Sequence, residues 1–171
     1  MRKLFGTKDI RGIANESLTP EFCVRLGEAI GSYIEGGDIL IGMDERLGSQ
    51  MVAHALVSGL ISAGCRIFWL GLATTPMVQY AVREFAGDGG IVITASHNPP
   101  EYTGIIILDE YGIEIPPEAR TEIENIFWEE KFTRAPWHSL KPIREVDTEH
   151  EVLKPYIESV LRQVDTPSTS S

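Results

Sequence analysis

The chain of 171 residues carries 25 acidic and 15 basic side chains, for a net charge of −10, and 43% of its residues are hydrophobic. This length and composition fit a folded domain with a core, and the acidic balance argues against nucleic-acid binding, which depends on clustered lysine and arginine. No apolar run reaches the roughly 18 residues that a membrane span needs, and no basic and apolar leader opens the chain, so we expect a cytoplasmic protein with no membrane partner.

The first predicted helix begins at Pro20. Thr19 can cap it, and proline suits the first helical position. Apolar side chains then recur on one face, and a pair of glycines ends the pattern: Phe22, Leu26, Ile30 and Ile34, then Gly36 and Gly37. Strands are predicted at 39–42, 66–70 and 91–93, with helices over 49–63 and 77–85 between them.

This alternation is typical of a sheet with largely parallel strands and helical crossovers. Ligands of such sheets lie beyond the carboxyl ends of the strands, which draws attention to residues 44–49 and 94–98. A fourth strand is predicted at 105–108, followed by a helix behind Pro116 and Pro117. Residues 134–147 form a loop or a short extended piece, a last helix runs over 152–164, and 165–171 form a linker-like tail.

The two cysteines, Cys23 and Cys65, lie in apolar segments. We expect both to be reduced core residues rather than disulfide partners or metal ligands.

Six residues, Thr94 to Pro99, directly follow the strand at 91–93. Small and polar side chains with a proline make a poor core and a good exposed loop. The hydroxyl of Ser96 would be exposed there, and His97 and the loop amides could bind phosphate oxygens. Residue chemistry alone also allows a plain turn whose side chains bond their own backbone.

The run Thr-Ala-Ser-His-Asn-Pro resembles the signature of the α-D-phosphohexomutase superfamily, which includes phosphoglucomutase, phosphomannomutase and phosphoglucosamine mutase. Further segments resemble family motifs in the same order: Phe5-Gly6-Thr7, Ile10-Arg11-Gly12, Gly42 to Arg46, Thr75-Pro76 and Pro100-Glu101-Tyr102. The resemblance covers residues 1–164. It implies the family's first domain, an α/β fold in which a mixed, mainly parallel sheet forms a three-layer α/β/α sandwich.

The family moves a phosphoryl group between the 1- and 6-positions of a hexose phosphate. By resemblance, Ser96 is the residue that is phosphorylated, and its phosphate supplies an oxygen to Mg²⁺, with the other metal ligands expected from a domain absent here. A hexose 1,6-bisphosphate is the implied activator. Arg11 is expected to stabilise charge on the migrating group, the alternative being an ordinary surface arginine.

His97 matches a residue beside the transferring phosphate, and a role in loop structure is the alternative. For Asp44 we expect a structural role rather than a catalytic one, with Arg46 paired to it.

Three positions depart from the family pattern: Met43 replaces an arginine, Thr103 an asparagine and Ile106 a lysine. The lysine is a candidate general acid or base, and isoleucine cannot transfer a proton. Ile106 also completes an apolar run that fits a buried strand better than a cleft wall. No aspartate-rich metal loop occurs in the sequence, so we expect little or no mutase turnover from this chain alone.

Two hypotheses remain open. The chain can be an enzyme domain that works on a hexose phosphate with the remaining mutase domains or a partner chain. Alternatively, it is a non-catalytic relative that binds a sugar phosphate or a partner protein. In either case an uncovered apolar face and self-association are expected.

Overall fold

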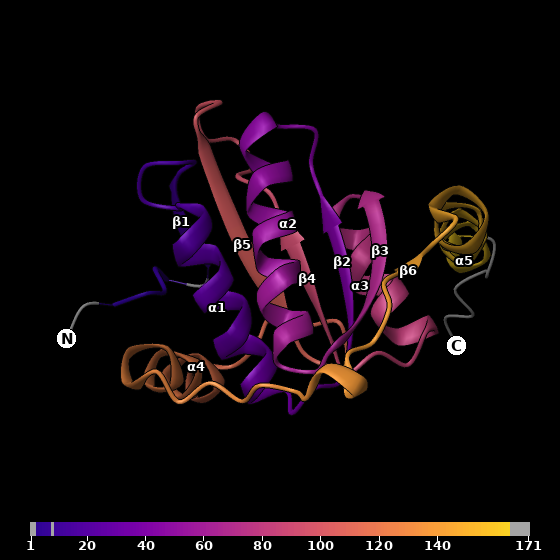
Figure 1. The fold of residues 1–171 in the computed structure, drawn as a ribbon. Coiled ribbons are helices and arrows are strands. Elements are labelled where there is room, and N and C mark those ends of the chain that lie inside the picture. Colours follow the sequence, from indigo (N-terminus) through magenta and orange to yellow (C-terminus); the bar gives the residue numbers. More distant parts are fainter. Residues whose placement is uncertain (1–2, 8, 165–171) are drawn as a thin grey trace.

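The computed structural model describes residues 3–7 and 9–164, and within these ranges six strands form one mixed sheet (Figure 1). The strands are β1 (Ile10–Ile13), β2 (Asp38–Met43), β3 (Arg66–Leu72), β4 (Gly89–Ile93), β5 (Tyr102–Leu108) and β6 (Arg144–Glu145). Their order is β1-β5-β4-β2-β3-β6, and all neighbours from β4 to β6 are parallel. Only β5 runs antiparallel to its neighbours, β1 and β4, which confirms the mixed, mainly parallel sheet.

Helices lie on both faces of this sheet, α1 (Pro20–Tyr33) and α2 (Leu47–Ser62) on one and α3 (Thr75–Glu84) on the other (Figure 1). Helix α4 (Pro117–Glu129) packs against α1, and α5 (Lys154–Val164) lies beyond the β6 edge of the sheet. One core cluster joins α1, α2 and α4 to the sheet, and a second lies between the sheet and α3. The predicted three-layer sandwich is therefore confirmed. The predicted linker-like tail at 165–171 lies outside the described residues.

Local chemistry starts the first helix as the sequence predicts. The hydroxyl oxygen of Thr19 accepts a hydrogen bond from the amide of Phe22 at 3.2 Å, and Pro20 is the first helical residue. Two elements were not predicted as strands: β1, and β6 within the segment expected to be a loop or a short extended piece.

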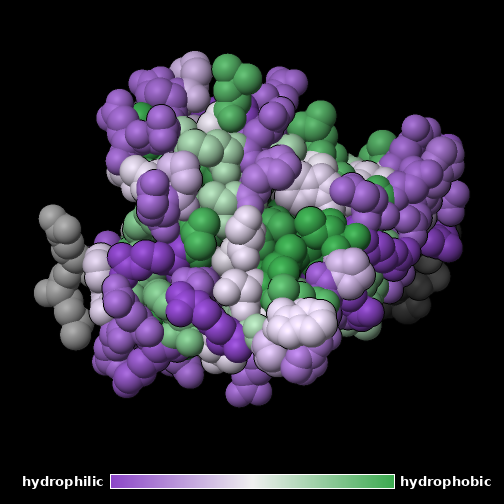
Figure 2. All heavy atoms as spheres, viewed as in Figure 1, coloured by the Kyte–Doolittle hydropathy of each residue, from purple (hydrophilic) through white to green (hydrophobic). Residues whose placement is uncertain are grey.

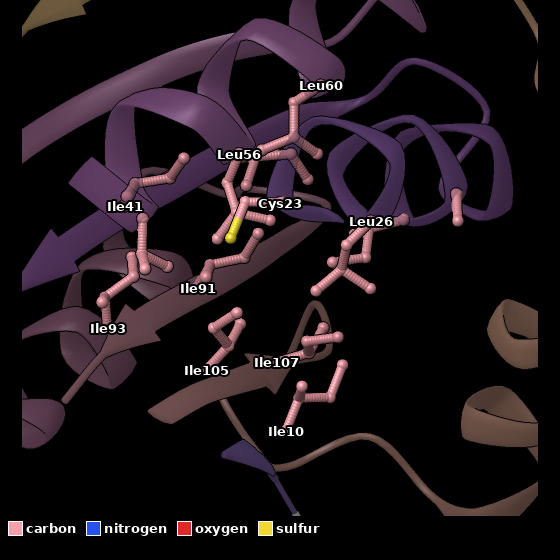
Figure 3. Packing of buried hydrophobic residues seen from close by; sticks show 14 of the residues in the cluster. Ile10, Cys23, Leu26, Ile41, Leu56, Leu60, Ile91, Ile93, Ile105 and Ile107 are labelled. Atoms are coloured by element: carbon pink, nitrogen blue, oxygen red, sulfur yellow. The ribbon is translucent and has the colours of Figure 1, made fainter. Parts of the chain in front are cut away.

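Alternation along the strands divides apolar side chains between the two faces of the sheet. On β5, Ile105 and Ile107 join the core under α1 and α2, whereas Ile106 points to the other face. The side chains labelled in Figure 3 belong to the first of these cores: Ile10, Cys23, Leu26, Ile41, Leu56, Leu60, Ile91, Ile93, Ile105 and Ile107. Burying one such side chain stabilises the fold by about 1.5–3 kcal/mol.

Both cysteines are fully buried and free, as predicted. Burial raises the pKa of each thiol, Cys23 and Cys65, to about 12. The two thiols therefore act as small apolar side chains of the core.

Several large hydrophobic side chains remain at the surface, and Figure 2 shows hydrophobic patches between hydrophilic areas on one face. On α5 none of the residues is buried, and four apolar ones at helical spacing are 42% to 75% exposed: Ile157, Val160, Leu161 and Val164. This agrees with the uncovered apolar face expected from the sequence. No helix in the described part of the chain is long and apolar enough to cross a lipid bilayer.

Candidate functional site

A cavity of about 730 Å³ is lined by residues of β1, β5, the loop after β4 and the N-terminal segment. It lies on the α3 side of the sheet, where Leu108 of β5 is buried in the core beneath α3 and Ile106 is only partly buried. Its lining consists of residues 3–7, Asp9, Arg11, Ser96, His97, Ile106 and Glu114. The volume lies within the range of small-molecule sites.

Ser96 stands at the tip of the loop that follows β4 and is exposed. Its φ angle is +52°, in the left-handed region, which costs a non-glycine residue about 1–2 kcal/mol. Such strain persists only where surrounding contacts impose it, and it occurs often at functional sites. The exposed loop predicted from the sequence is therefore confirmed, with the serine in an unusual backbone conformation.

Arg11, on β1, reaches the same cavity from a distant part of the sequence. Its Nε and Nη2 donate to Asp9 Oδ2 at 3.0 and 2.5 Å, and its Nη1 donates to Asn98 Oδ1 at 3.0 Å. Arg11 is thereby tied to the serine loop through Asn98. A guanidinium has five N–H groups, so two remain for an anion in the cavity.

The three predicted site residues Ser96, His97 and Arg11 thus line one cavity. The sequence analysis missed Asp9 and Asn98, which orient Arg11. Asp9 lies directly before β1, two residues from Arg11, so an ion pair between the two was the available indication in the sequence.

Arg46 makes more contacts than the pairing with Asp44 that the sequence suggested. Its two terminal nitrogens donate to four carbonyl oxygens of the serine loop, by which we mean residues 94–102, from the end of β4 to the first residue of β5. Nη2 bonds Ser96 O at 2.8 Å and Asn98 O at 2.9 Å, and Nη1 bonds Pro99 O at 2.7 Å and Tyr102 O at 3.1 Å. The loop is therefore held to the start of α2 by one side chain.

Asp44 has the structural contacts expected of it. Its Oδ1 accepts hydrogen bonds from the amide of Arg46 at 3.1 Å and from the hydroxyl of Ser49 at 2.6 Å. Its Oδ2 lies 3.4 Å from Arg46 Nε. The carboxylate thus orients the arginine that holds the loop.

For Ile106, the expectation of a buried strand position in place of a cleft wall is wrong. The strand is buried as a whole, but Ile106 is only partly buried and lines the cavity. The reason is alternation: Ile105 and Ile107 face the core beneath α1 and α2, whereas Ile106 lies on the other face, at the margin of the core beneath α3. The wall of the cavity is therefore apolar where the family pattern has a lysine.

The other two departures lie inside the fold. Met43 is 8% exposed and belongs to the core beneath α1 and α2. Thr103 is fully buried, and its hydroxyl has no hydrogen-bond partner among the described residues. An unsatisfied buried hydroxyl costs about 1–3 kcal/mol.

Within the described residues, no group of three or more histidine, cysteine, aspartate or glutamate side chains could hold a metal ion. These residues do not fit a complete Mg²⁺ site, because this ion takes six oxygen ligands. A phosphorylated Ser96 would add one such oxygen at the cavity.

The model of the phosphoglucomutase/phosphomannomutase alpha/beta/alpha domain I matches residues 2–134. The chain is 44% identical over 170 residues to a phosphoglucomutase/phosphomannomutase of Thermococcus kodakarensis, and 45% identical over 166 residues to a phosphoglucosamine/phosphogalactosamine mutase of Sulfurisphaera tokodaii. Each match covers 96% of this chain and 36% of the relative, so the chain spans about a third of the relatives' length.

Among solved structures, the chain resembles one from Thermus thermophilus that is assigned as a phosphomannomutase, with a TM-score of 0.78 and 30% identity. This match covers 93% of the present chain and 35% of that one. The fold and the motif-bearing segments therefore have counterparts in larger proteins.

Proposed function

The chain belongs to the phosphoglucomutase/phosphomannomutase family, and we propose that it is the phosphoserine-bearing domain of a phosphohexomutase. In this proposal Ser96 carries the phosphoryl group that moves between the 1- and 6-positions of a hexose phosphate. The domain extends over residues 1–164. The observation that carries the proposal is the exposed, left-handed Ser96 on a cavity that also contains Arg11 and His97.

The reaction needs two transfers at one oxygen. In the first, phosphorylated Ser96 gives its phosphoryl group to a sugar hydroxyl: the serine P–O bond breaks, a P–O bond to the sugar forms, and the hydroxyl proton passes to Ser96 Oγ. In the second, Ser96 Oγ takes the other phosphate of the resulting bisphosphate: the P–O bond to that sugar oxygen breaks, a P–O bond to Ser96 forms, and the serine proton passes to the sugar oxygen. In the transition state, negative charge is distributed over the oxygens of the transferring phosphoryl group. The positioning of the reacting groups and nearby cations therefore supply most of the catalysis.

Arg11 is placed to supply such a cation, with N–H groups left over after its bonds to Asp9 and Asn98. His97 is exposed at the same cavity and can donate a hydrogen bond to a phosphoryl oxygen. Mg²⁺, when bound, would offset charge on the phosphoryl group through an oxygen of phosphorylated Ser96, with its other ligands from outside the described residues.

We further propose that this chain alone turns over little or no substrate. Its cavity is open to water, and exclusion of water favours transfer to a sugar over hydrolysis. The remaining mutase domains, or a partner chain, would close the cleft and supply the missing ligands. The exposed apolar stripe on α5 supports a need for such a partner, since large apolar patches mark association surfaces.

The test is phosphopeptide mapping of Ser96 after incubation with a hexose 1,6-bisphosphate and Mg²⁺, with and without the remaining mutase domains. We expect phosphate on Ser96, more of it when the other domains are present, and none in Ser96→Ala. Absence of phosphate from Ser96 in the reconstituted protein would exclude the enzyme role.

Ile106 favours a second candidate function, a non-catalytic relative that binds a sugar phosphate or a partner protein. Its side chain on the cavity wall cannot move a proton. In that case a hexose phosphate binds the chain in calorimetry, and Ser96 stays unmodified under the conditions above.

A further inference from the structure

The serine loop has few contacts of its own that could fix its shape. Pro99 and Pro100 have no N–H to donate. The bonds within the loop run from the amide of Ser96 to Thr94 Oγ1 at 3.2 Å, and from the amides of Asn98 and Tyr102 to Ala95 O and Pro99 O, both at 3.0 Å. The backbone of Ser96 is nevertheless held in the left-handed region. Contacts from outside the loop add to these bonds in holding this conformation.

Arg46 supplies four of these outside contacts, because both terminal nitrogens of its guanidinium are fully engaged with carbonyl oxygens of the loop. Arg46 does not line the cavity, so it holds the loop from outside the cavity wall. Its own position is fixed by the bond between its amide and Asp44, at the start of α2. A lysine could not replace it fully, since an ammonium has three N–H groups and no planar fork.

The bond to Ser96 O also determines where the next amide points. In a trans peptide the carbonyl and the N–H point in opposite directions, and the described chain has no cis peptide. With Ser96 O directed at Arg46, the N–H of His97 points away from Arg46. This amide has no hydrogen-bond partner among the described residues, and both Ser96 and His97 line the cavity.

We propose that Arg46 is a positioning residue that fixes the peptide between Ser96 and His97, so that the His97 amide is presented to a phosphoryl group on Ser96. Backbone N–H groups beside a left-handed residue form favourable sites for phosphate oxygens. The proposal rests on the proposed function for its phosphoryl group, whereas the fixing of the loop is independent of it.

The test compares Arg46→Gln and Arg46→Lys with the unchanged chain and with Arg25→Gln. Arg25 is a matched control because it is bonded to Glu130 on the surface, away from the serine loop. Amide hydrogen exchange over residues 95–102 reports the order of the loop. In Arg46→Gln we expect these amides to exchange at least about tenfold faster, with exchange in β2 and α1 unchanged. Arg46→Lys should lie in between, and it keeps the test decisive if the glutamine variant unfolds.

The second readout is the phosphorylation of Ser96 by a hexose 1,6-bisphosphate and Mg²⁺, with the remaining mutase domains supplied. We expect the rate constant to fall about 10²-fold in Arg46→Gln, as for a reacting group misplaced by about 1 Å, and the half-saturating bisphosphate concentration to change little. In the unchanged chain the amide proton resonance of His97 should shift downfield when Ser96 is phosphorylated, and this shift should be lost in Arg46→Gln.

Three outcomes would overturn the proposal: unchanged exchange of the loop in both Arg46 variants, an unchanged rate constant, or a rise in the half-saturating concentration alone, which would mean that Arg46 contacts the substrate. If Ser96 is not phosphorylated even in the unchanged chain, the proposed function fails. The exchange data still decide whether Arg46 fixes the loop.

Discussion

Replacing Ile106 with lysine would return to the cavity wall the cation that the family pattern has at this position. Ile106 lies on the α3 side of β5, partly buried at the margin of the core there, and lines the same cavity as Ser96 and Arg11. A lysine stem could follow the apolar wall and carry its ammonium into the open cavity. The carboxylate of Asp9 at the cavity is already paired with Arg11, whereas Glu114 also lines the cavity and would offset part of the added charge.

The cost to stability follows from the burial of this side chain. Ile106 is only partly buried, so losing its burial costs roughly 1 kcal/mol, about half the value for a fully buried aliphatic side chain. The aliphatic stem of lysine recovers part of this loss. For a chain of this size the midpoint of thermal unfolding should therefore fall by about 1–4 °C.

The gain should appear in the transfer of the phosphoryl group from phosphorylated Ser96 to a hexose monophosphate, with the remaining mutase domains supplied. A positioned general acid or base contributes about 10²-fold or more, so Ile106→Lys should raise this rate by that order. Ile106→Met is the control, since it keeps an apolar side chain of similar length. Equal rates in the two variants would refute the reasoning that the apolar wall limits proton transfer.

Three further predictions concern the fold. A Cβ at Gly59 would overlap the backbone of α1, so Gly59→Ala should lower the free energy of unfolding by about 1–3 kcal/mol in urea titrations, although alanine is the better helix former. Because burial raises the pKa of Cys23 and Cys65 to about 12, neither thiol should react with a thiol reagent at neutral pH until the chain unfolds. The hydrogen bond and charge of Asp147 raise the pKa of His150, so this pair stabilises the turn before α5 below the ordinary value of 6.5 and ceases to do so as the pH rises through the raised value. Amide exchange at 150–153, taken relative to the intrinsic exchange rate at each pH, should quicken over that range, and Asp147→Asn should abolish this relative change.

Much of the architecture could be predicted because helix starts and strand alternation are local properties. Thr19 and Pro20 fix the start of α1 through contacts within one turn. By contrast, β1 is four residues long and exists because it pairs with β5, about ninety residues later in the chain. Four residues are too few to show a recognisable alternation of apolar and polar side chains, so this strand could not be predicted from its own sequence.

At the candidate site, too, local features could be predicted and long-range contacts could not. The exposure of Ser96 followed from its place after a buried strand, which is a local inference. The role of Arg46 could not be inferred in this way, because its four acceptors are backbone carbonyls about fifty residues away in the sequence. Every residue has a backbone carbonyl, so the residue types do not show which ones accept these bonds. An arginine two residues after an aspartate suggests an ion pair, and only the folded loop reveals the other contacts.

Met43 and Ile106 each stand where the family pattern has a positively charged residue, but their positions in the fold differ, and so does what they imply about catalysis. Met43 is buried among the side chains beneath α1 and α2, where a thioether packs well and an unpaired guanidinium would be costly. The presence of methionine here in place of the family's arginine is thus explained by packing, and it does not indicate whether the site is catalytic. Ile106 faces the cavity, where the stem of a lysine could follow the wall and its ammonium could reach the open space. Of the two, only Ile106 distinguishes a catalytic domain from a binding one.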